Sequence, residues 1–180
     1  EHGIVGGTSA SAPLWAGFAA LVNQQAALRS KPPIGFINPA LYTIGQVHGN
    51  LSDLDLALSF YRLAQPVFRE VGDRAWEALT WNSIGLVHDA QGQPDQALDA
   101  YGQALPLYRA AADTAGQAWT LFNTCLAYQD LGQTGEALDA CEQALILYRQ
   151  VGDRAWEAKT LFRIGLSHRE LADYAQAIAT

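Results

Sequence analysis

Apolar and small residues recur at every third or fourth position through most of the chain, with polar residues between them. From about residue 51 onward this spacing is typical of amphipathic α-helices that bury one face. Glycine-containing breaks separate the stretches, because glycine suits the position just beyond a helix C-terminus. The pattern predicts helices near residues 52–70, 74–91, 94–110, 114–131, 134–150 and 154–171, with a further helix starting at 174–180.

One heptapeptide, Gly-Asp-Arg-Ala-Trp-Glu-Ala, occurs twice, letter for letter, at 72–78 and 152–158. A weakened copy at 112–118 lies halfway between them, so the repeat period is forty residues. A fixed period of this size is typical of stacked architectures, in which each helix pair buries its apolar face against its neighbours. The predicted fold class is therefore all-α, an antiparallel helix-pair solenoid over residues 47–180, with about three units and the last one truncated.

The forty-residue unit resembles the tetratricopeptide repeat, in the longer form of the kinesin-light-chain-like subgroup. The usual unit has about 34 residues, and the extra residues here are the Val-Gly-Asp-Arg-Ala-Trp insert. Within a unit, the first helix carries a small-residue packing site and a ring side chain, and the second helix carries alanines at fixed steps. The resemblance is carried by Ile84, Gly85, His88, Ala97, Tyr101, Ala104, Ala137, Cys141, Ala144, Ile164, Gly165 and His168.

This resemblance implies a protein-interaction scaffold that binds a peptide or protein partner. In the family, the first helices of successive units line a concave face, where asparagine side chains often hold a peptide main chain. An amide side chain both donates and accepts hydrogen bonds, which suits that task. We expect Asn82, Asn123, Lys159 and Arg163 to contact the partner; the alternative is that they form a solvated helix surface.

Residues 1–46 follow a different pattern. Small residues from Gly6 to Ala12 lead into an apolar stretch at 13–22. A serine mounted at the mouth of a helix lies beside free backbone N–H groups that favour a developing negative charge. The same local sequence also fits a plain helix N-cap at Ser9 or Ser11.

The longer string from Gly3 to Gly45 resembles the nucleophile region of the sedolisins, subtilisin-fold serine-carboxyl endopeptidases that act at acidic pH. The resemblance implies a turn-helix-loop fragment of a subtilisin-like fold, with Ser9 in the place of the nucleophile. The family's glutamate base and two aspartates lie upstream of its serine, and none can be matched here. Because a serine needs an adjacent, oriented base, we expect this chain to carry a non-catalytic remnant.

Two alternatives stay open for how the two parts are combined. The chain is a piece of an active sedolisin-like endopeptidase whose repeat tail recruits a partner, or two unrelated sequences are joined near Ile44-Gly45. The sequence has no methionine, and its last residues begin a helix that earlier units continue, so we expect a fragment of a longer protein. Localisation stays open too, since sedolisins are exported whereas such repeats are usually cytoplasmic.

Charge and apolar content limit the partners that we expect. The formal net charge is −7, and residues 51–180 carry the acidity without a cluster of Lys or Arg. Such a surface argues against nucleic acid or an anionic membrane as partner. The longest uncharged apolar run, at 13–22, is also shorter than the roughly twenty residues that a membrane-spanning helix needs.

No cofactor is expected from the remaining candidate ligands. The sedolisin resemblance implies a calcium site downstream of the serine, but the chain passes into repeats after Gly45. Asp53 and Asp55 have a spacing that oxygen ligands can have, yet they lie at a predicted helix start. Cys125 and Cys141 lack any metal-ligand spacing, and we predict two buried thiols at packing positions.

Overall fold

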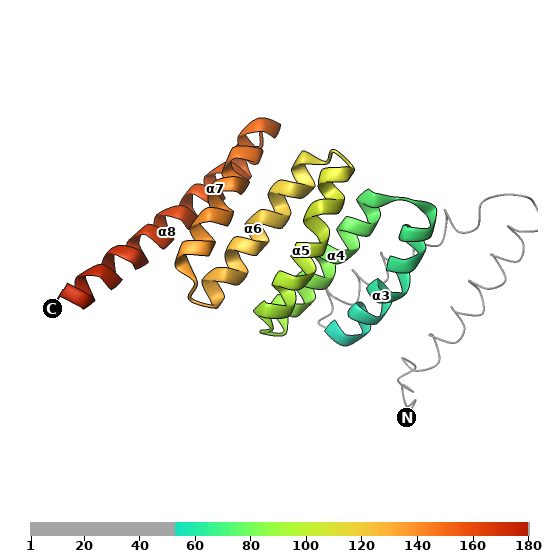
Figure 1. Cartoon of the computed structure of the whole chain (residues 1–180), viewed down its shortest axis with the longest axis horizontal. Coiled ribbons are helices and arrows are strands. Elements are labelled where there is room, and N and C mark those ends of the chain that lie inside the picture. The colour runs from blue at the N-terminus through green and yellow to red at the C-terminus, as the bar shows by residue number, and fades with distance from the viewer. Residues whose placement is uncertain (1–52, 180) are drawn as a thin grey trace, which may run out of the picture.

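The computed structural model describes the backbone of residues 53–179 and the side chains of residues 53–172 (Figure 1). Residues 1–46, with Ser9 and the sedolisin resemblance, lie outside this described part of the chain. The described residues form helices joined by short turns, without a strand, so the predicted all-α class is confirmed. The helices are α3 (Leu54–Val71), α4 (Arg74–Ala90), α5 (Pro94–Ala110), α6 (Thr114–Asp130), α7 (Thr134–Val151) and α8 (Arg154–Ala179).

The six helices stack in chain order as an extended array (Figure 1). Each helix packs against the next one in the chain, and α4 also contacts α6, so first helices of neighbouring units meet. Alanines at the helix contacts allow the axes to approach closely. The predicted helix-pair solenoid is confirmed. The alanines without any exposed surface are Ala57, Ala64, Ala78, Ala97, Ala104, Ala118, Ala127, Ala137 and Ala144.

The repeated Gly-Asp pair forms the turns between units. Gly72 and Gly152 adopt left-handed φ angles of 74° and 75°, a conformation that costs glycine little. The following residues, Asp73 and Asp153, accept hydrogen bonds from the backbone N–H groups three residues ahead, at 3.2 and 3.1 Å. One dipeptide thus ends one helix and caps the next. In the middle copy Ala112 takes the glycine's place, with a φ of 54°.

The tryptophan of the repeated motif fixes one unit against the next. Trp76 stacks on Phe68 at 5.5 Å between ring centres, and Trp156 stacks on Tyr148 at 5.7 Å. An ion pair lies beside each stack, with Arg69 Nε 2.8 Å from Glu77 Oε1 at the first junction. The second junction repeats it, with Arg149 Nε 3.0 Å from Glu157 Oε1. The two junctions are therefore built alike, with Phe68 under the tryptophan of the first and Tyr148 under that of the second.

The weakened copy of the motif at 112–118 packs its junction with different residues. Gly116 stands where the other copies have tryptophan, and the Tyr108 ring lies directly over its Cα. A Cβ added at Gly116 would come within 2.4 Å of that ring. The glycine therefore makes room for a tyrosine from the preceding helix, in place of the tryptophan of the other two copies.

The two cysteines form a disulfide, so the prediction of two buried thiols is wrong. The Cys125–Cys141 bond joins α6 to α7, with 5.3 Å between the Cα atoms. In the preceding unit the equivalent residues are Gly85 and Tyr101, and a Cβ at Gly85 would come within 2.3 Å of the tyrosine ring. Both pairs fill the same space, and the sequence separation of 16 residues did not reveal that the sulfur atoms face each other.

The last helix is the second point at which the sequence prediction is wrong. A break was expected between residues 171 and 174, but α8 continues without interruption from Arg154 to Ala179. The earlier units turn at Gly92 and Gly132, both with a φ of 70°. Ala172 occupies the equivalent position, and an alanine does not favour the left-handed conformation that this turn requires.

Candidate partner-binding surfaces

Two of the predicted contact residues, Lys159 and Arg163, line one hollow between the first helices α6 and α8. Its volume is about 550 Å³. We call it the α6–α8 hollow. Its lining consists of Phe122, Trp156, Ala158, Lys159, Phe162 and Arg163.

The α6–α8 hollow combines two cations with exposed aromatic surface. Lys159 and Arg163 are one helical turn apart, so their side chains project from the same face of α8. The Lys159 Nζ atom lies 4.0 Å from the centre of the Trp156 ring, a cation–π contact. Phe162 keeps 66% of its surface exposed between them. This arrangement suits a ligand that carries both an acidic group and an apolar side chain.

The aromatic wall of the hollow is held in place by its neighbours. Trp156 stacks on Tyr148 and meets the edge of Phe122 at 5.1 Å between ring centres. A ring fixed on two sides loses little further freedom when a ligand packs on it, which lowers the entropic cost of binding. The hollow is therefore a preformed surface.

The other two predicted contacts, Asn82 and Asn123, lie below the surface, at 0% and 4% exposure. Within the described residues, both side-chain atoms of Asn82 and the Nδ2 of Asn123 lack hydrogen-bond partners. The forty-residue period also aligns Asn82 with Phe122 and aligns Asn123 with Arg163, so the two asparagines do not form one column. Their role as direct contacts stays a prediction.

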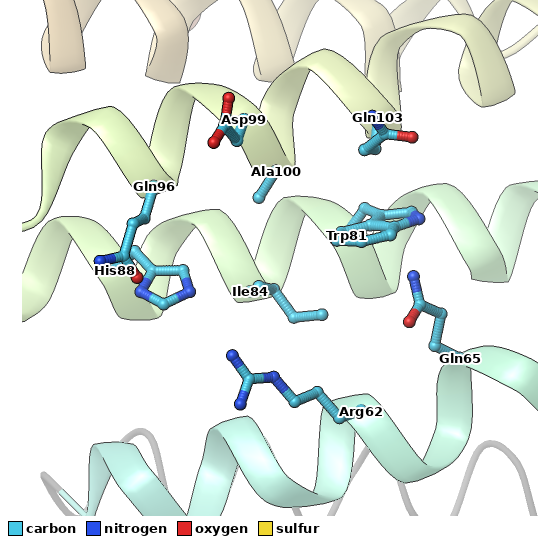
Figure 2. A pocket seen from close by; sticks show the side chains of 9 residues that line it. All are labelled: Arg62, Gln65, Trp81, Ile84, His88, Gln96, Asp99, Ala100 and Gln103. Atoms are coloured by element: carbon cyan, nitrogen blue, oxygen red, sulfur yellow. The ribbon is translucent and has the colours of Figure 1, made fainter.

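A second hollow, which sequence reasoning missed, runs between α3 and α5 above α4 and has a volume of about 630 Å³. We call it the α3–α5 groove. Figure 2 shows Trp81, Ile84 and His88 in a row along its floor. No local motif could have revealed it, because three helices from two units contribute. Its walls are Arg62 and Gln65 on one side and Gln96, Asp99 and Gln103 on the other, with Ala100 at the base of the second wall.

A half-buried carboxyl, Asp89, lies near the C-terminal end of α4. The Asp89 side chain accepts a hydrogen bond from the Tyr101 hydroxyl through Oδ2, whereas its Oδ1 has no partner among the described residues. Burial raises the pKa of Asp89, with a further contribution from the negative charge of Asp130; the Tyr101 hydrogen bond and nearby His88 act in the opposite direction. Burial and the Asp89 contact together also raise the pKa of Tyr101.

Neither a metal cluster nor a membrane span is found where the structure can be described. Residues 53–172 contain no group of three or more His, Cys, Asp and Glu side chains placed to hold a metal ion. None of the six described helices is both long and apolar enough to cross a bilayer.

Solved structures of low sequence identity share the helical array. RapI in its apo form aligns with a TM-score of 0.71 at 15% identity, over 79% of this chain and 40% of that one. BtubC from P. vanneervenii aligns with a TM-score of 0.70 at 18% identity, over 79% and 59%. A Rap protein complexed with Competence and Sporulation Factor aligns with a TM-score of 0.65 at 20% identity, over 89% and 45%. At such identities the likeness concerns the fold alone.

Curated relatives match over short stretches only. Tripeptidyl-peptidase 1 of Dictyostelium discoideum is 38% identical over 77 residues, which cover 42% of this chain and 12% of that protein. Probable tripeptidyl-peptidase SED4 of Arthroderma benhamiae is 51% identical over 51 residues, and human tripeptidyl-peptidase 1 is 49% identical over 45 residues. The chain thus spans about a tenth of the length of these relatives, between 8% and 12%.

A family model for the tetratricopeptide repeat matches residues 36–110 and 116–180. The match covers more than half of the chain and reaches into every helix of the described array. Sequence period, helix pairing and family model therefore agree, and this chain belongs to the tetratricopeptide repeat family.

Proposed function

We propose that this chain is a protein-interaction scaffold that binds an acidic peptide segment of a partner in the α6–α8 hollow. The observation that carries the proposal is that Lys159 and Arg163 flank the exposed Phe162 ring on one face of α8. In a chain of net charge −7, two neighbouring cations beside aromatic surface mark a place where a negative ligand is attracted locally. Hydrogen bonds from charged donors to carboxylates are stronger than neutral ones.

The partner segment should carry an apolar side chain next to its acidic one. The apolar side chain would pack on Phe162 and Phe122, while carboxylates meet Lys159 and Arg163. Aromatic side chains supply large contact area at interfaces, and arginine is enriched there. The fold likeness to a Rap protein complexed with Competence and Sporulation Factor supports the view that such arrays bind ligands, without naming the ligand of this chain.

Binding can be tested with fluorescent peptides that place one Phe or Leu between Glu residues, and with a matched set in which Gln replaces every Glu. We expect the Glu set to bind, and the double substitution Lys159→Ala and Arg163→Ala to weaken binding about tenfold, since each charged hydrogen bond contributes 1.5–3 kcal/mol, here partly offset by exposure. Arg109→Ala is the matched control, an exposed cation of α5. Equal binding of the Glu and Gln sets would refute the proposal.

For residues 1–46 we propose a non-catalytic remnant of a sedolisin-like serine peptidase. The sequence resemblance and the short matches to tripeptidyl-peptidases support the peptidase origin. Within residues 1–46 nothing matches the family's glutamate base, and a serine without an adjacent base is a weak nucleophile. The test is casein cleavage at acidic pH by this chain and by its Ser9→Ala variant. Cleavage that disappears in the variant would favour the alternative, a fragment that retains serine endopeptidase activity.

A further inference from the structure

We propose that a third hollow, between the N-terminal turns of α6 and α8, binds the guanidinium group of an arginine in the partner segment. We call it the Asp113–Asp153 hollow, after the two carboxylates that line it, and its volume is about 380 Å³. This size is at the low end of ligand sites, which suits a single side chain. The proposal rests on the scaffold function proposed above, because the arginine belongs to the same partner segment. The aromatic residues of the lining are Tyr108, Trp119, Tyr148 and Trp156.

The charge of the Asp113–Asp153 hollow favours a cation. Its lining contains two aspartates and no lysine or arginine, and neither carboxylate forms an ion pair with a described residue. Both aspartates cap helices, and each helix N-terminus carries only about half a positive charge. Two full negative charges against two such halves leave about one negative charge in the hollow, so a cationic side chain is attracted there.

Each carboxylate keeps an oxygen that the helix cap does not use. The backbone N–H of Gly116 donates to Asp113 Oδ1 at 2.8 Å, and that of Trp156 donates to Asp153 Oδ1 at 3.1 Å. Asp113 Oδ2 lies 2.8 Å from the place of a Cβ on Gly116, which is also the place that the Tyr108 ring approaches. The second oxygen is therefore beside the aromatic lining.

Asp153 has the same relation to a ring on the other side of the hollow. Burial raises the pKa of the Tyr148 hydroxyl, and the negative charge of Asp153 raises it further, as expected of a carboxylate near the ring. The hollow thus pairs a carboxylate with an aromatic ring on each of its two sides. This combination suits a cation with a flat apolar face.

Trp119 is the lining residue that helix packing explains least. At steps of forty residues its equivalents are Leu79 and Lys159, so the array is built elsewhere without a tryptophan at this position. Unlike Trp76 and Trp156, Trp119 meets no other ring among the described residues, and it is only half-buried. Its indole therefore keeps surface for a ligand, and tryptophan is the strongest aromatic partner of a cation.

Arginine fits this lining better than lysine does. Its planar guanidinium stacks on aromatic rings and presents a fork of N–H donors to carboxylates, whereas lysine ends in a compact, strongly hydrated ammonium. Bound on Trp119, the guanidinium can donate to the free oxygens of Asp113 and Asp153. Hydrogen bonds between two charged groups of this kind are shorter and stronger than neutral ones.

The Asp113–Asp153 hollow and the α6–α8 hollow are adjacent and opposite in charge. Trp156 lines both of them, with Lys159 and Arg163 in one and the two aspartates in the other. A single partner segment can therefore place acidic groups in the first hollow and an arginine in the second. Such a pair of opposite charges fixes the direction in which the segment lies.

The first test uses the side chain alone. The chain labelled with ¹⁵N is titrated with N-acetyl-arginine methylamide and, in parallel, with its uncharged citrulline analogue. We expect the Gly116 amide and the Trp119 indole N–H signals to shift saturably with the arginine compound and not with the citrulline compound. Equal shifts with both compounds, or shifts at neither group, would overturn the proposal.

Substitutions then separate the charge from the fold. The double substitution Asp113→Asn and Asp153→Asn removes both charges but keeps good N-cap residues, so urea unfolding should change little while arginine binding weakens about five- to tenfold. Trp119→Leu, which installs the residue of the first unit, should weaken binding as well. Asp73→Asn is the matched control, because it removes the charge of the cap of α4 and should leave binding unchanged. If the double variant binds arginine as tightly as wild type, the two carboxylates do not form the site.

The last test joins the two hollows. The Glu peptides described above are extended at either end by Gly-Ser linkers of zero to five residues that finish in Arg or in citrulline. We expect one linker length to give an advantage of Arg over citrulline that disappears with Asp113→Asn and Asp153→Asn and survives Lys159→Ala and Arg163→Ala. Glu peptides that bind but gain nothing from Arg at any length would overturn this inference alone. An advantage of Arg without discrimination between Glu and Gln would support it and refute the α6–α8 proposal.

Discussion

Reducing the Cys125–Cys141 disulfide should lower the stability of the array by about 3 kcal/mol. The two cysteines are 16 residues apart, and the chain-entropy estimate for a loop of that length is about 3 kcal/mol. Both side chains are fully buried, so reduction leaves two thiols in an apolar site and adds no charge. With a typical urea dependence of about 1–3 kcal/mol per M, the unfolding midpoint should fall by roughly 1–3 M.

The assay is urea unfolding followed by far-UV circular dichroism, with and without a phosphine reductant. Thiol titration of the unfolded chain should find two reactive thiols only after reduction. The double substitution Cys125→Gly and Cys141→Tyr is the informative control, because it installs the Gly85–Tyr101 pair of the preceding unit and should recover part of the lost stability through packing. If the oxidised and reduced chains unfold at the same urea concentration, the cross-link does not stabilise the array.

Four further substitutions test individual backbone and burial features. Gly116→Ala should destabilise by about 1–3 kcal/mol, because its Cβ would overlap the Tyr108 ring. At Gly102 an added Cβ would meet no atom within 4 Å, so Gly102→Ala should stabilise the array by about 0.5–1 kcal/mol. Equal effects of Gly116→Ala and Gly102→Ala in urea unfolding would contradict the packing argument. Ala112→Gly should raise the thermal midpoint, since a φ of 54° strains alanine by about 1–2 kcal/mol, and a lower midpoint would show that chain entropy outweighs this strain. Asp89→Asn should be more stable than wild type at neutral pH, and this difference in stability should disappear in acid. The reason is that the pKa of Asp89 is raised in the folded state, so the stability of the wild type falls as the pH rises through that pKa. If the difference in stability between Asp89→Asn and wild type does not change with pH, ionisation of the Asp89 carboxyl is not its cause.

The sequence predicted the repeat architecture well because the same physical requirement recurs every forty residues. Gly-Asp pairs at 72–73 and 152–153 indicated helix boundaries to within one or two residues, since each pair ends one helix and caps the next. The break expected near Ala172 failed because no left-handed glycine is present there. Helix boundaries were thus predictable where a turn residue specified them.

The binding surfaces were less predictable, because they depend on which helix faces meet. Lys159 and Arg163 share a hollow as expected of neighbours on one helix, whereas Asn82 is covered once the array closes. The Cys125–Cys141 bond requires two helix faces to meet in register. The hydrophobic period indicates which face of each helix is buried, but not which side chains meet across the contact.

The duplicated junction makes the length of this array adjustable in whole units. Residues 72–78 and 152–158 are identical, and each copy places its Trp on an aromatic ring and its Glu beside an Arg of the preceding helix. An exchange between them would delete or duplicate eighty residues and still keep the Gly-Asp turn, the Trp and the Glu of the junction. Genetic recombination can therefore change the number of helix pairs in the array while keeping the residues that form this turn.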